Sequence, residues 1–329
     1  MKSKTNILFY EITSDYEFEK ACFDLLKTHY DLNPVYRSYC NLINKSPESI
    51  NSIREIPFLP ISFFRNHQIK IFSEKPKLVF KSSGTTNNNL SKHFLKNEIN
   101  YKKSFSKSFE LFYGKPSDWT ILALLPNYHK RENSSLIFMV NDLIKQSKSF
   151  ESGFYLNDYK KLYKLLLNLE SRNQKTILIG VSFALLNFIE QKKIKLSNTL
   201  IIETGGMKGK RKELIRNELH NKLRKGFGVK TIHSEYGMTE LLSQAYSNKN
   251  GLFKCPPWMK VLSREVDDPL TICEFEKTGG LNIIDLANSE SCPFIATDDL
   301  GKVYSSGKFE VLGRFDHSDI RGCNLLISN

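Results

Sequence analysis

Between residues 78 and 236 the sequence alternates short β-prone runs with segments of helical periodicity, and this alternation constrains the fold more than any other feature. The β-prone runs begin at Leu78, Thr120, Thr176, Thr199 and Lys230. Apolar residues recur at three- and four-residue steps between them, near residues 98–112, 134–147, 158–170, 183–192 and 210–225. Strands that alternate with helices predict an α/β fold with a mostly parallel sheet flanked by helices.

The ends of the chain follow other patterns. Residues 11–43 have helical periodicity, and Pro57 and Pro60 interrupt the chain after them. After about residue 250 the β-prone runs become shorter and are separated by turns, as at Leu281 and Lys308, which predicts a smaller β subdomain. We therefore expect three parts. They are an N-terminal helical segment packing on the core over residues 1–60, an α/β core over residues 61–250 and a β-rich subdomain over residues 251–329.

Composition excludes several classes of protein. The net charge of +13 comes from lysines spread over nearly every segment and mixed with asparagine and acids, so we expect a solvated surface and no nucleic-acid partner. The apolar run at residues 7–10 is too short for a signal-peptide core. No stretch approaches the roughly 18 consecutive apolar residues of a membrane span. These features predict a cytoplasmic protein without a membrane span.

The cysteines favour neither a metal site nor a disulfide framework. They show no CxxC pair and no tight Cys/His cluster, so we expect no structural zinc. Without a secretion signal, disulfides are not expected either, and most of these thiols should be buried as small apolar side chains. The six cysteines are Cys22, Cys40, Cys255, Cys273, Cys292 and Cys323.

A loop rich in hydroxyl groups follows the β-prone run at Leu78. It contains Ser82, Ser83, Gly84, Thr85 and Thr86. These residues are typical of a solvent-exposed turn, but they are also typical of an anion cradle, in which backbone N–H groups and hydroxyls bind phosphate oxygens. The spacing is not that of a P-loop, and neither is the glycine run at Gly205 and Gly206. A phosphate site therefore needs support from elsewhere in the chain.

That support comes from the position of the other unusual segments. Each follows a predicted strand, and the carboxyl ends of strands line the ligand crevice of open α/β sheets. We therefore expect one site at a single edge. The segments are residues 82–86, 126–131, 203–210 and 234–240.

The last of these segments combines an aromatic ring, a glycine, a hydroxyl and a carboxylate. It contains Tyr236, Gly237, Met238, Thr239 and Glu240. One interpretation is a strand end followed by a helix that Thr239 caps. The other is a nucleotide triphosphate site, in which Tyr236 faces a purine while Thr239 and Glu240 hold phosphate and Mg²⁺, a cation that prefers oxygen ligands.

Two further segments complete the constellation. Residues 297–301 include Asp299, whose carboxylate can accept hydrogen bonds from ribose hydroxyls, and residues 313–322 include Arg314. In this order the segments resemble the signatures of adenylate-forming enzymes, the superfamily of acyl-CoA synthetases, luciferases and peptide-synthetase adenylation domains. Residues 82–86 resemble its phosphate loop, residues 236–240 its adenine and magnesium motif, Asp299 its ribose aspartate and residues 313–316 its hinge motif.

A closer resemblance is to the acyl-protein synthetase (LuxE) branch, which is related to phenylacetate-CoA ligases. It covers roughly residues 55–329 and is carried by residues 80–86, 91–93, 203–209, 233–244 and 321–323. The resemblance implies the adenylate-forming N-terminal domain type and a cytoplasmic ligase that uses ATP and Mg²⁺ to activate a carboxylic, fatty acid. The acyl group would then pass to Cys323, and from there to an acceptor protein or a reductase.

The resemblance also implies residue roles. Glu240 is the expected Mg²⁺ ligand. The expected ATP contacts are Ser82, Ser83, Gly84, Thr85, Thr86, Gly205, Gly206, Tyr236, Gly237, Met238, Thr239, Asp299 and Arg314.

One departure leaves alternatives open. Adenylate-forming enzymes continue past the hinge motif into a domain with a catalytic lysine, whereas this sequence ends at Asn329, and Lys92 and Lys208 are the candidates to replace that lysine. The alternatives are a CoA ligase-like acyltransferase with another acceptor, for which Cys323 is dispensable, and a non-catalytic acyl- or nucleotide-binding remnant. The apolar run at residues 180–186 fits either an acyl pocket or a core helix.

Overall fold

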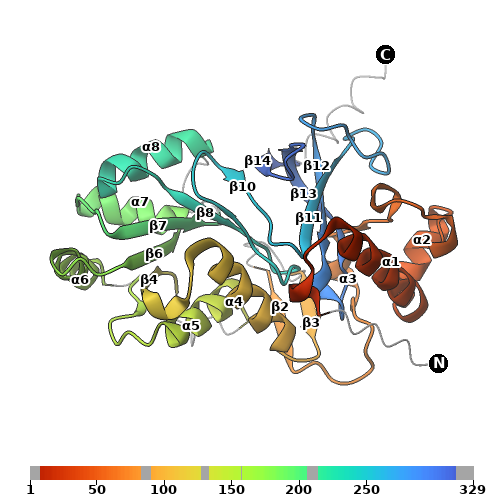
Figure 1. The fold of residues 1–329 in the computed structure, drawn as a ribbon, viewed down its shortest axis with the longest axis horizontal. Helices are drawn as coiled ribbons and strands as arrows, with labels where there is room; N and C mark the ends of the chain where they lie inside the picture. The colour runs from red at the N-terminus through yellow and green to blue at the C-terminus, as the bar shows by residue number, and fades with distance from the viewer. Residues whose placement is uncertain (1–7, 83–89, 127–132, 157, 206–213, 316–329) are drawn as a thin grey trace, which may run out of the picture.

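The computed structural model describes residues 8–82, 90–126, 133–156, 158–205 and 214–315. Within these residues, two six-stranded sheets and one two-stranded hairpin form a molecule with two lobes (Figure 1). The first lobe holds the α/β sheet, and the second holds the sheet built mainly from the C-terminal part of the chain. The hairpin lies where the two lobes meet (Figure 1).

The first sheet has the strand order β5-β4-β6-β7-β8-β9 and is parallel except at β9. Every residue of β4 and β6 is buried, which explains their continuous apolar runs. The parallel α/β fold predicted from the sequence is therefore confirmed. The strands are β4 (Thr120–Leu124), β5 (Gly153–Phe154), β6 (Thr176–Val181), β7 (Thr199–Thr204), β8 (His233–Tyr236) and β9 (Ala245–Ser247).

Helices cover both faces of this sheet (Figure 1). Phe109 of α4 and Leu143 of α5 face Ile177 and Ile179 across a small apolar cavity on one side. Helices α6, α7 and α8 pack on the other side, with the rings of Phe188 and Phe227 stacked. The helices are α4 (Ile99–Tyr113), α5 (Ser135–Ser147), α6 (Tyr159–Ser171), α7 (Ser182–Gln191) and α8 (Arg216–Phe227).

The second sheet has the order β10-β14-β13-β12-β11, with β1 beside β13, and is antiparallel except for that pair. The N-terminal helices pack against it, and His29 of α1 contacts the carbonyl oxygen of Ser289. The strands are β1 (Leu59–Pro60), β10 (Leu252–Phe253), β11 (Met259–Arg264), β12 (Thr278–Asp285), β13 (Phe294–Val303) and β14 (Phe309–Arg314). The helices are α1 (Asp15–Leu32), α2 (Pro34–Leu42) and α3 (Phe63–Asn66).

Two strand predictions were wrong in detail. The run at Leu78 forms β2 (Leu78–Lys81), which pairs with β3 (Lys92–Leu95) as an antiparallel hairpin and lies outside the parallel sheet. The turn-forming residues between the two runs favour pairing of neighbours in the chain. The run at Lys230 lies before the strand, because β8 begins at His233, where its pairing with β7 starts opposite Ile202. Two of the four segments expected after strands begin inside a strand instead, at residues 203–204 of β7 and 234–236 of β8.

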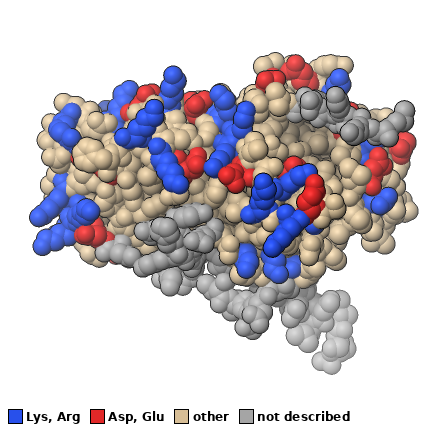
Figure 2. All heavy atoms as spheres, turned by 90° about the horizontal axis from the view of Figure 1, so that it is seen from below, with Lys and Arg blue, Asp and Glu red and all other residues tan. Residues whose placement is uncertain are grey.

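The surface shows mixed charge. On the face drawn in Figure 2, Lys and Arg side chains of the described residues lie scattered among acids and uncharged residues and form no continuous band. Of the helices that the structure describes, none combines the length and the apolar character that crossing a membrane requires.

A buried carboxylate joins the two sheets. Asp285, at the end of β12, is fully buried and accepts hydrogen bonds from the backbone N–H groups of Leu242, at 2.7 Å, and Ser243, at 3.0 Å. It also accepts from the Ser243 hydroxyl at 2.5 Å and from the N–H of Ala287 at 3.2 Å. Trp258 donates from its indole nitrogen to the same hydroxyl at 3.0 Å. The segment between β8 and β9 is thus anchored to the second sheet.

We predict that Asp285→Ala lowers the free energy of unfolding by at least about 3 kcal/mol, because it leaves several buried donors without an acceptor at roughly 1–3 kcal/mol each. Urea unfolding measures the change as a shift of the midpoint. The control is Asp268→Ala, which removes an exposed carboxylate from a hairpin turn and should cost less than about 1 kcal/mol. Equal costs for the two variants would show that Asp285 does not join the sheets.

Candidate active site

Three residues predicted to lie in one site do come together. Asp299 of β13 and Arg314 of β14 are direct partners in the strand register, and Arg314 Nε lies 3.1 Å from Asp299 Oδ1. Tyr236, at the end of β8, donates its hydroxyl to Asp299 Oδ2 at 2.7 Å. Burial raises the pKa of Asp299, and Arg314 and Tyr236 oppose that rise. The carboxylate therefore lies between the two sheets. Its Oδ2 contacts Tyr236 of the first sheet, and its Oδ1 contacts Arg314 of the second.

Aromatic packing fixes the orientation of Tyr236. Its ring meets those of Phe253 and Phe309 edge-on, at centroid distances of 5.8 and 5.4 Å. The two phenylalanines stack on each other at 5.3 Å, and the guanidinium of Arg216 lies 5.0 Å from the Phe253 ring centroid. Burial, followed by the Asp299 carboxylate, raises the pKa of Tyr236 well above its usual value, so its hydroxyl keeps the proton that it donates.

The segment after β8 forms a turn and then β9, so the alternative of a helix capped by Thr239 is wrong. The turn is closed by a hydrogen bond from Leu241 N to Met238 O at 3.2 Å. Glu240 is buried, with 4% of its surface exposed, and burial raises its pKa. A hydrogen bond from Ser91 and the charges of Arg314 and Arg65 oppose this rise.

Strand β3 supplies the neighbours of this turn. Because side chains alternate along a strand, Ser91 and His93 are buried while Lys92 points to the opposite, exposed side. The ring of His93 lies between the carbonyl oxygen of Thr239, 2.8 Å from Nδ1, and Asn288 Oδ1, 3.0 Å from Nε2. Burial lowers the pKa of His93 to about 4, and these two contacts offset only part of the effect.

The described part of the hydroxyl-rich loop begins at Ser82, which pairs with Ser91. Ser82 N donates to Ser91 O, and Ser91 N donates to Ser82 Oγ, both at 3.1 Å. These bonds close the base of the loop. Ser83, Gly84, Thr85 and Thr86 lie outside the described residues, as do Gly206, Lys208 and Cys323.

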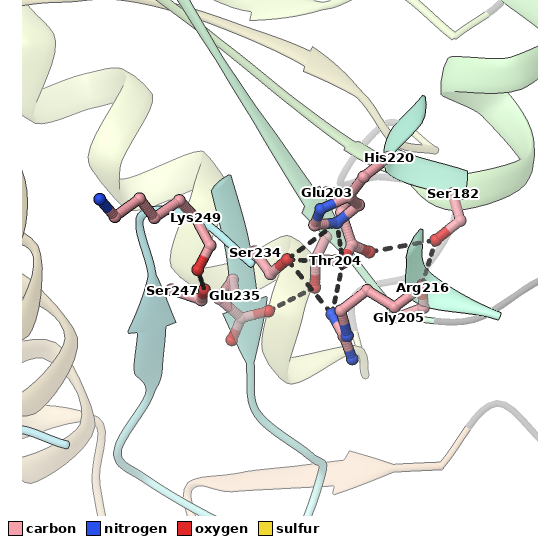
Figure 3. A network of polar contacts seen from close by, with 10 residues as sticks. All are labelled: Ser182, Glu203, Thr204, Gly205, Arg216, His220, Ser234, Glu235, Ser247 and Lys249. Carbon is pink, nitrogen blue, oxygen red and sulfur yellow. Dashed lines mark hydrogen bonds and ion pairs between the residues drawn. The ribbon is translucent and has the colours of Figure 1, made fainter. Parts of the chain in front are cut away.

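A second buried carboxylate, Glu203 at the end of β7, organises the neighbouring edge of the sheet (Figure 3). Its Oε1 accepts from Arg216 and from the Ser234 hydroxyl, each at 2.7 Å, and lies 3.4 Å from His220 Nε2. Burial would raise the pKa of Glu203, but its hydrogen bonds and the Arg216 charge outweigh it, so the pKa is lowered. His220 Nε2 also faces Ser234 Oγ at 3.3 Å, so a single ring nitrogen makes both contacts and the set is not a Ser-His-acid triad.

The same network reaches the glycine run. Ser182, at the start of α7, lies 3.2 Å from Glu203 Oε2 and donates to the carbonyl oxygen of Gly205 at 2.6 Å (Figure 3). Gly205 has φ +62°, a conformation that side chains disfavour. The apolar run at residues 180–186 ends β6 and begins α7, and Leu185 is fully buried, as expected for a core helix.

The described thiols are poorly suited to act as nucleophiles. Burial raises the pKa of Cys22 and of Cys292 to about 12 and that of Cys40 to about 11. Burial also raises the pKa of Cys255 and Cys273. A thiolate is the reactive form of cysteine, so each of these five side chains is held in its unreactive form at neutral pH.

For several residues of this site, the sequence alone predicted no role. Arg216, Asp285 and Asn288 are isolated polar residues in segments without a motif, so no local pattern marks them. His93 had a signal, because it lies two residues after Ser91 in a short segment next to the hydroxyl-rich loop.

Comparison with known proteins shows which family the sequence matches and which solved structures share its fold. The sequence matches the family described as acyl-protein synthetase, LuxE, over residues 8–329. Comparison with curated protein sequences gives no significant match. A solved structure of 2-hydroxyisobutyryl-CoA ligase, in the postadenylation state with 2-HIB-AMP, superimposes with a TM-score of 0.68 at 11% identity, covering 92% of this chain and 68% of that one.

A second likeness is to ATP-bound MatB from Rhodopseudomonas palustris. Its TM-score is 0.53 at 16% identity, and the match covers 74% of this chain. The chain spans about half the length of MatB, since 49% of that protein is covered. At these identities the two likenesses establish the fold, which is that of adenylate-forming ligases.

We predict that Arg216→Met lowers the free energy of unfolding at pH 7 by about 3–5 kcal/mol, because it leaves the buried Glu203 carboxylate without its cation. In the wild type the lowered pKa of Glu203 gives stability above its ordinary pKa of 4.5, which is lost as pH falls through the folded-state value. In the variant, burial prevails and raises the pKa of Glu203, so the stability of the variant should increase as pH falls from 7 toward 5. Urea unfolding across this pH range measures the loss at pH 7 and the pH dependence.

The matched control is Arg172→Met, which breaks the more exposed contact of Arg172 with Glu151. Its cost should stay below about 1 kcal/mol and should not depend on pH in this way. A pH profile of Arg216→Met that parallels the wild type would contradict the assigned role of Glu203.

Proposed function

We propose, since the chain belongs to the acyl-protein synthetase (LuxE) family, that it activates a carboxylic acid with ATP as an acyl-adenylate and transfers the acyl group to a thiol. The observation that carries this proposal is the direct contact of Asp299 with Tyr236 and Arg314. This contact supports the proposal because it involves one residue from each of the segments that resemble the ribose, adenine and hinge motifs of adenylate-forming enzymes. A fatty acid is the substrate class that the family suggests.

In this proposal ATP lies along the edge formed by β8, β13 and the hydroxyl-rich loop. Asp299 accepts hydrogen bonds from the ribose hydroxyls, and Tyr236 offers its ring to the purine. Phosphate oxygens are bound by the donors of residues 82–86 and by Thr239, while Gly205, Gly206, Gly237 and Met238 line the nucleotide. The ATP in the MatB structure and the 2-HIB-AMP in the ligase structure are consistent with such a site in this fold.

Glu240 suits a magnesium ion. Its carboxylate is buried with a raised pKa, so burial alone disfavours its charge, and a nearby cation would compensate for that. Mg²⁺ is commonly bound through one or two carboxylates together with substrate phosphates. The described residues include no cluster of three or more His, Cys, Asp or Glu side chains able to hold a metal, so Glu240 would act together with the phosphates. Bound Mg²⁺ would supply neutralisation of phosphate charge.

The reaction consists of two displacements. An oxygen of the substrate carboxylate attacks the α-phosphorus of ATP, and the bond to pyrophosphate breaks. A thiolate then attacks the carbonyl carbon of the acyl-adenylate, a thioester forms and AMP leaves. Hydroxyl and backbone donors of residues 82–86 stabilise the charge that develops in the first step. Lys92 and Lys208 remain the predicted lysines, although Lys92 is exposed on the face of β3 that points away from Glu240.

The acceptor thiol in this proposal is Cys323. The five cysteines that the structure describes all have pKa values raised by burial, which favours a thiol elsewhere in the chain. Arg314 and Arg321 are close to Cys323 in the sequence, and nearby cations favour the thiolate. A CoA-like acceptor is the second candidate, because the 2-hydroxyisobutyryl-CoA ligase structures, two of them with CoA, cover 92–94% of this chain.

We predict that the wild-type protein gains the mass of an acyl group when it is incubated with ATP, Mg²⁺ and a fatty acid. Hydroxylamine should remove the adduct, as expected for a thioester, and Cys323→Ser should abolish it. Intact-protein mass spectrometry with a panel of fatty and aryl acids measures this and identifies the acid class. The matched control is Cys255→Ser, because Cys255 is the most exposed of the described cysteines, and it should acylate normally.

The other outcomes separate the alternatives. Release of AMP and pyrophosphate without a mass gain, but with CoA thioester formation when CoA is added, would identify a CoA ligase-like enzyme. A protein that binds ATP but forms no product with any acid would be a non-catalytic remnant. Acylation that persists in Cys323→Ser would show that another group carries the acyl chain.

We predict that Asp299→Asn raises the KM for ATP by roughly tenfold to a hundredfold, because hydrogen bonds to a charged acceptor contribute about 1.5–3 kcal/mol. Steady-state kinetics of pyrophosphate release measures the change. The control is Asp298→Asn, a neighbouring carboxylate on β13 that lies 4.0 Å from Arg65, and it should leave the KM for ATP near the wild-type value. Equal KM values for the two variants would remove the ribose role from Asp299.

A further inference from the structure

His93 is a fully buried polar residue for which the proposed reaction has no role. It lies in β3, two residues after Ser91, which directly precedes the strand; both side chains are buried, whereas that of Lys92 between them is exposed. The ring of Phe64 packs edge-on against it at a centroid distance of 6.0 Å. Burial of a histidine costs free energy unless its nitrogens have partners, so its contacts indicate what the residue does.

Those contacts converge on the turn that carries Glu240. Nδ1 of His93 lies 2.8 Å from the carbonyl oxygen of Thr239, and Nε2 lies 3.0 Å from Asn288 Oδ1. The amide nitrogen of Asn288 donates to the carbonyl oxygen of Glu240 at 2.8 Å and to that of Cys292 at 2.9 Å. Because both hydrogens of this amide point at carbonyl oxygens, its Oδ1 faces the histidine ring. The neutral ring has one N–H, so it donates either to this oxygen or to the carbonyl oxygen of Thr239, and the other contact is one of packing.

These contacts lie on both peptide planes beside the Cα atom of Glu240. The carbonyl group of Thr239 belongs to the plane that precedes this atom, and the carbonyl group of Glu240 belongs to the plane that follows it. His93 contacts the first directly and the second through Asn288. The direction in which the buried carboxylate leaves the main chain is therefore set by these two side chains.

Ser91, directly before β3, connects Glu240 with the hydroxyl-rich loop. Ser91 hydrogen-bonds the Glu240 side chain, and its backbone pairs with Ser82 at the base of the hydroxyl-rich loop. β3 thus links the loop assigned to phosphate with the carboxylate assigned to Mg²⁺. Lys92, between these two residues, points away from both.

We infer that His93 is a positioning residue that orients Glu240 for Mg²⁺ by holding the carbonyl groups on both sides of it. The inference rests on the proposed function, because it takes Mg²⁺ and ATP as the ligands. Side chains that orient a metal ligand without touching the metal typically account for tenfold to a hundredfold in metal affinity.

The experiment measures binding of ATP by calorimetry over a series of Mg²⁺ concentrations and in EDTA, without an acid substrate. His93→Leu, which keeps an apolar side chain in place but removes both contacts, should raise the Mg²⁺ concentration for half-maximal ATP binding by about tenfold to a hundredfold. ATP binding in EDTA should stay unchanged. His93→Asn places an amide nitrogen near the position of Nδ1, keeps the donor to Thr239 and should restore most of the Mg²⁺ dependence.

The matched control is His29→Leu. His29 is equally buried, and its Nε2 lies 3.0 Å from the carbonyl oxygen of Ser289, the residue after Asn288. Among the described residues, it makes no hydrogen bond with the turn that carries Glu240. It should lose stability without a change in Mg²⁺ dependence. If leucine at position 93 prevents folding, His93→Gln replaces it. Glutamine keeps only the contact near Nε2, and it should bind Mg²⁺ less well than His93→Asn.

Two results would overturn the inference in different ways. If folded His93 variants show the wild-type Mg²⁺ dependence, or if His29→Leu shows the same shift, the inference fails and the proposed function stands. If the wild-type protein binds no ATP at any Mg²⁺ concentration, the proposed function fails and the inference fails with it.

Discussion

Residues 237–244 impose the constraint on which the rest of the site depends. This segment is neither helix nor strand, yet its residues from Glu240 onward are buried. Buried backbone N–H and C=O groups need partners, and without regular structure those partners must be largely side chains. Asp285 accepts from two N–H groups of the segment, while His93 and Asn288 contact two of its carbonyl groups. The side chains that satisfy the segment come from β3, from the end of β12 and from the short helical turn that follows β12, so satisfying it also brings the two lobes together.

The site follows from this junction. The first sheet contributes Tyr236, and the second contributes the cross-strand pair of Asp299 and Arg314. Neither lobe has the complete set, so the junction has to form before the tyrosine hydroxyl can reach the carboxylate. The Phe253 and Phe309 rings, from β10 and β14, fill the space behind Tyr236 and make the junction apolar where the nucleotide is not expected. Stability of the interface and geometry of the site are therefore properties of the same contacts.

The sequence predicted the parallel sheet well, because β4, β6 and β7 are buried on both faces and appear as unbroken apolar runs. It also predicted that Tyr236, Asp299 and Arg314 lie close together, since they belong to short motifs with a chemical reason for each residue. It failed for β2, because a run of four residues does not show which partner it will pair with. It gave no role to Asp285, Asn288 or Arg216, because what these side chains do depends on the junction, and no local pattern encodes a contact between distant segments.

The buried carboxylates differ in how far the surrounding protein compensates their charge. Glu203 is surrounded by donors and by Arg216, and its pKa is lowered, so its charge is compensated within the protein. The pKa values of Glu240 and Asp299 are raised, because burial outweighs the donors and cations around them. The pKa of Asp285 is also raised by burial, although that carboxylate accepts several hydrogen bonds from the protein. A protein selected only for stability would replace such groups with apolar side chains of similar size, which is often neutral or stabilising. Carboxylates that are buried with incomplete compensation gain most from a ligand that brings the missing donors or positive charge. Under the proposed function, ribose hydroxyls at Asp299 and a magnesium ion at Glu240 would be ligands of that kind.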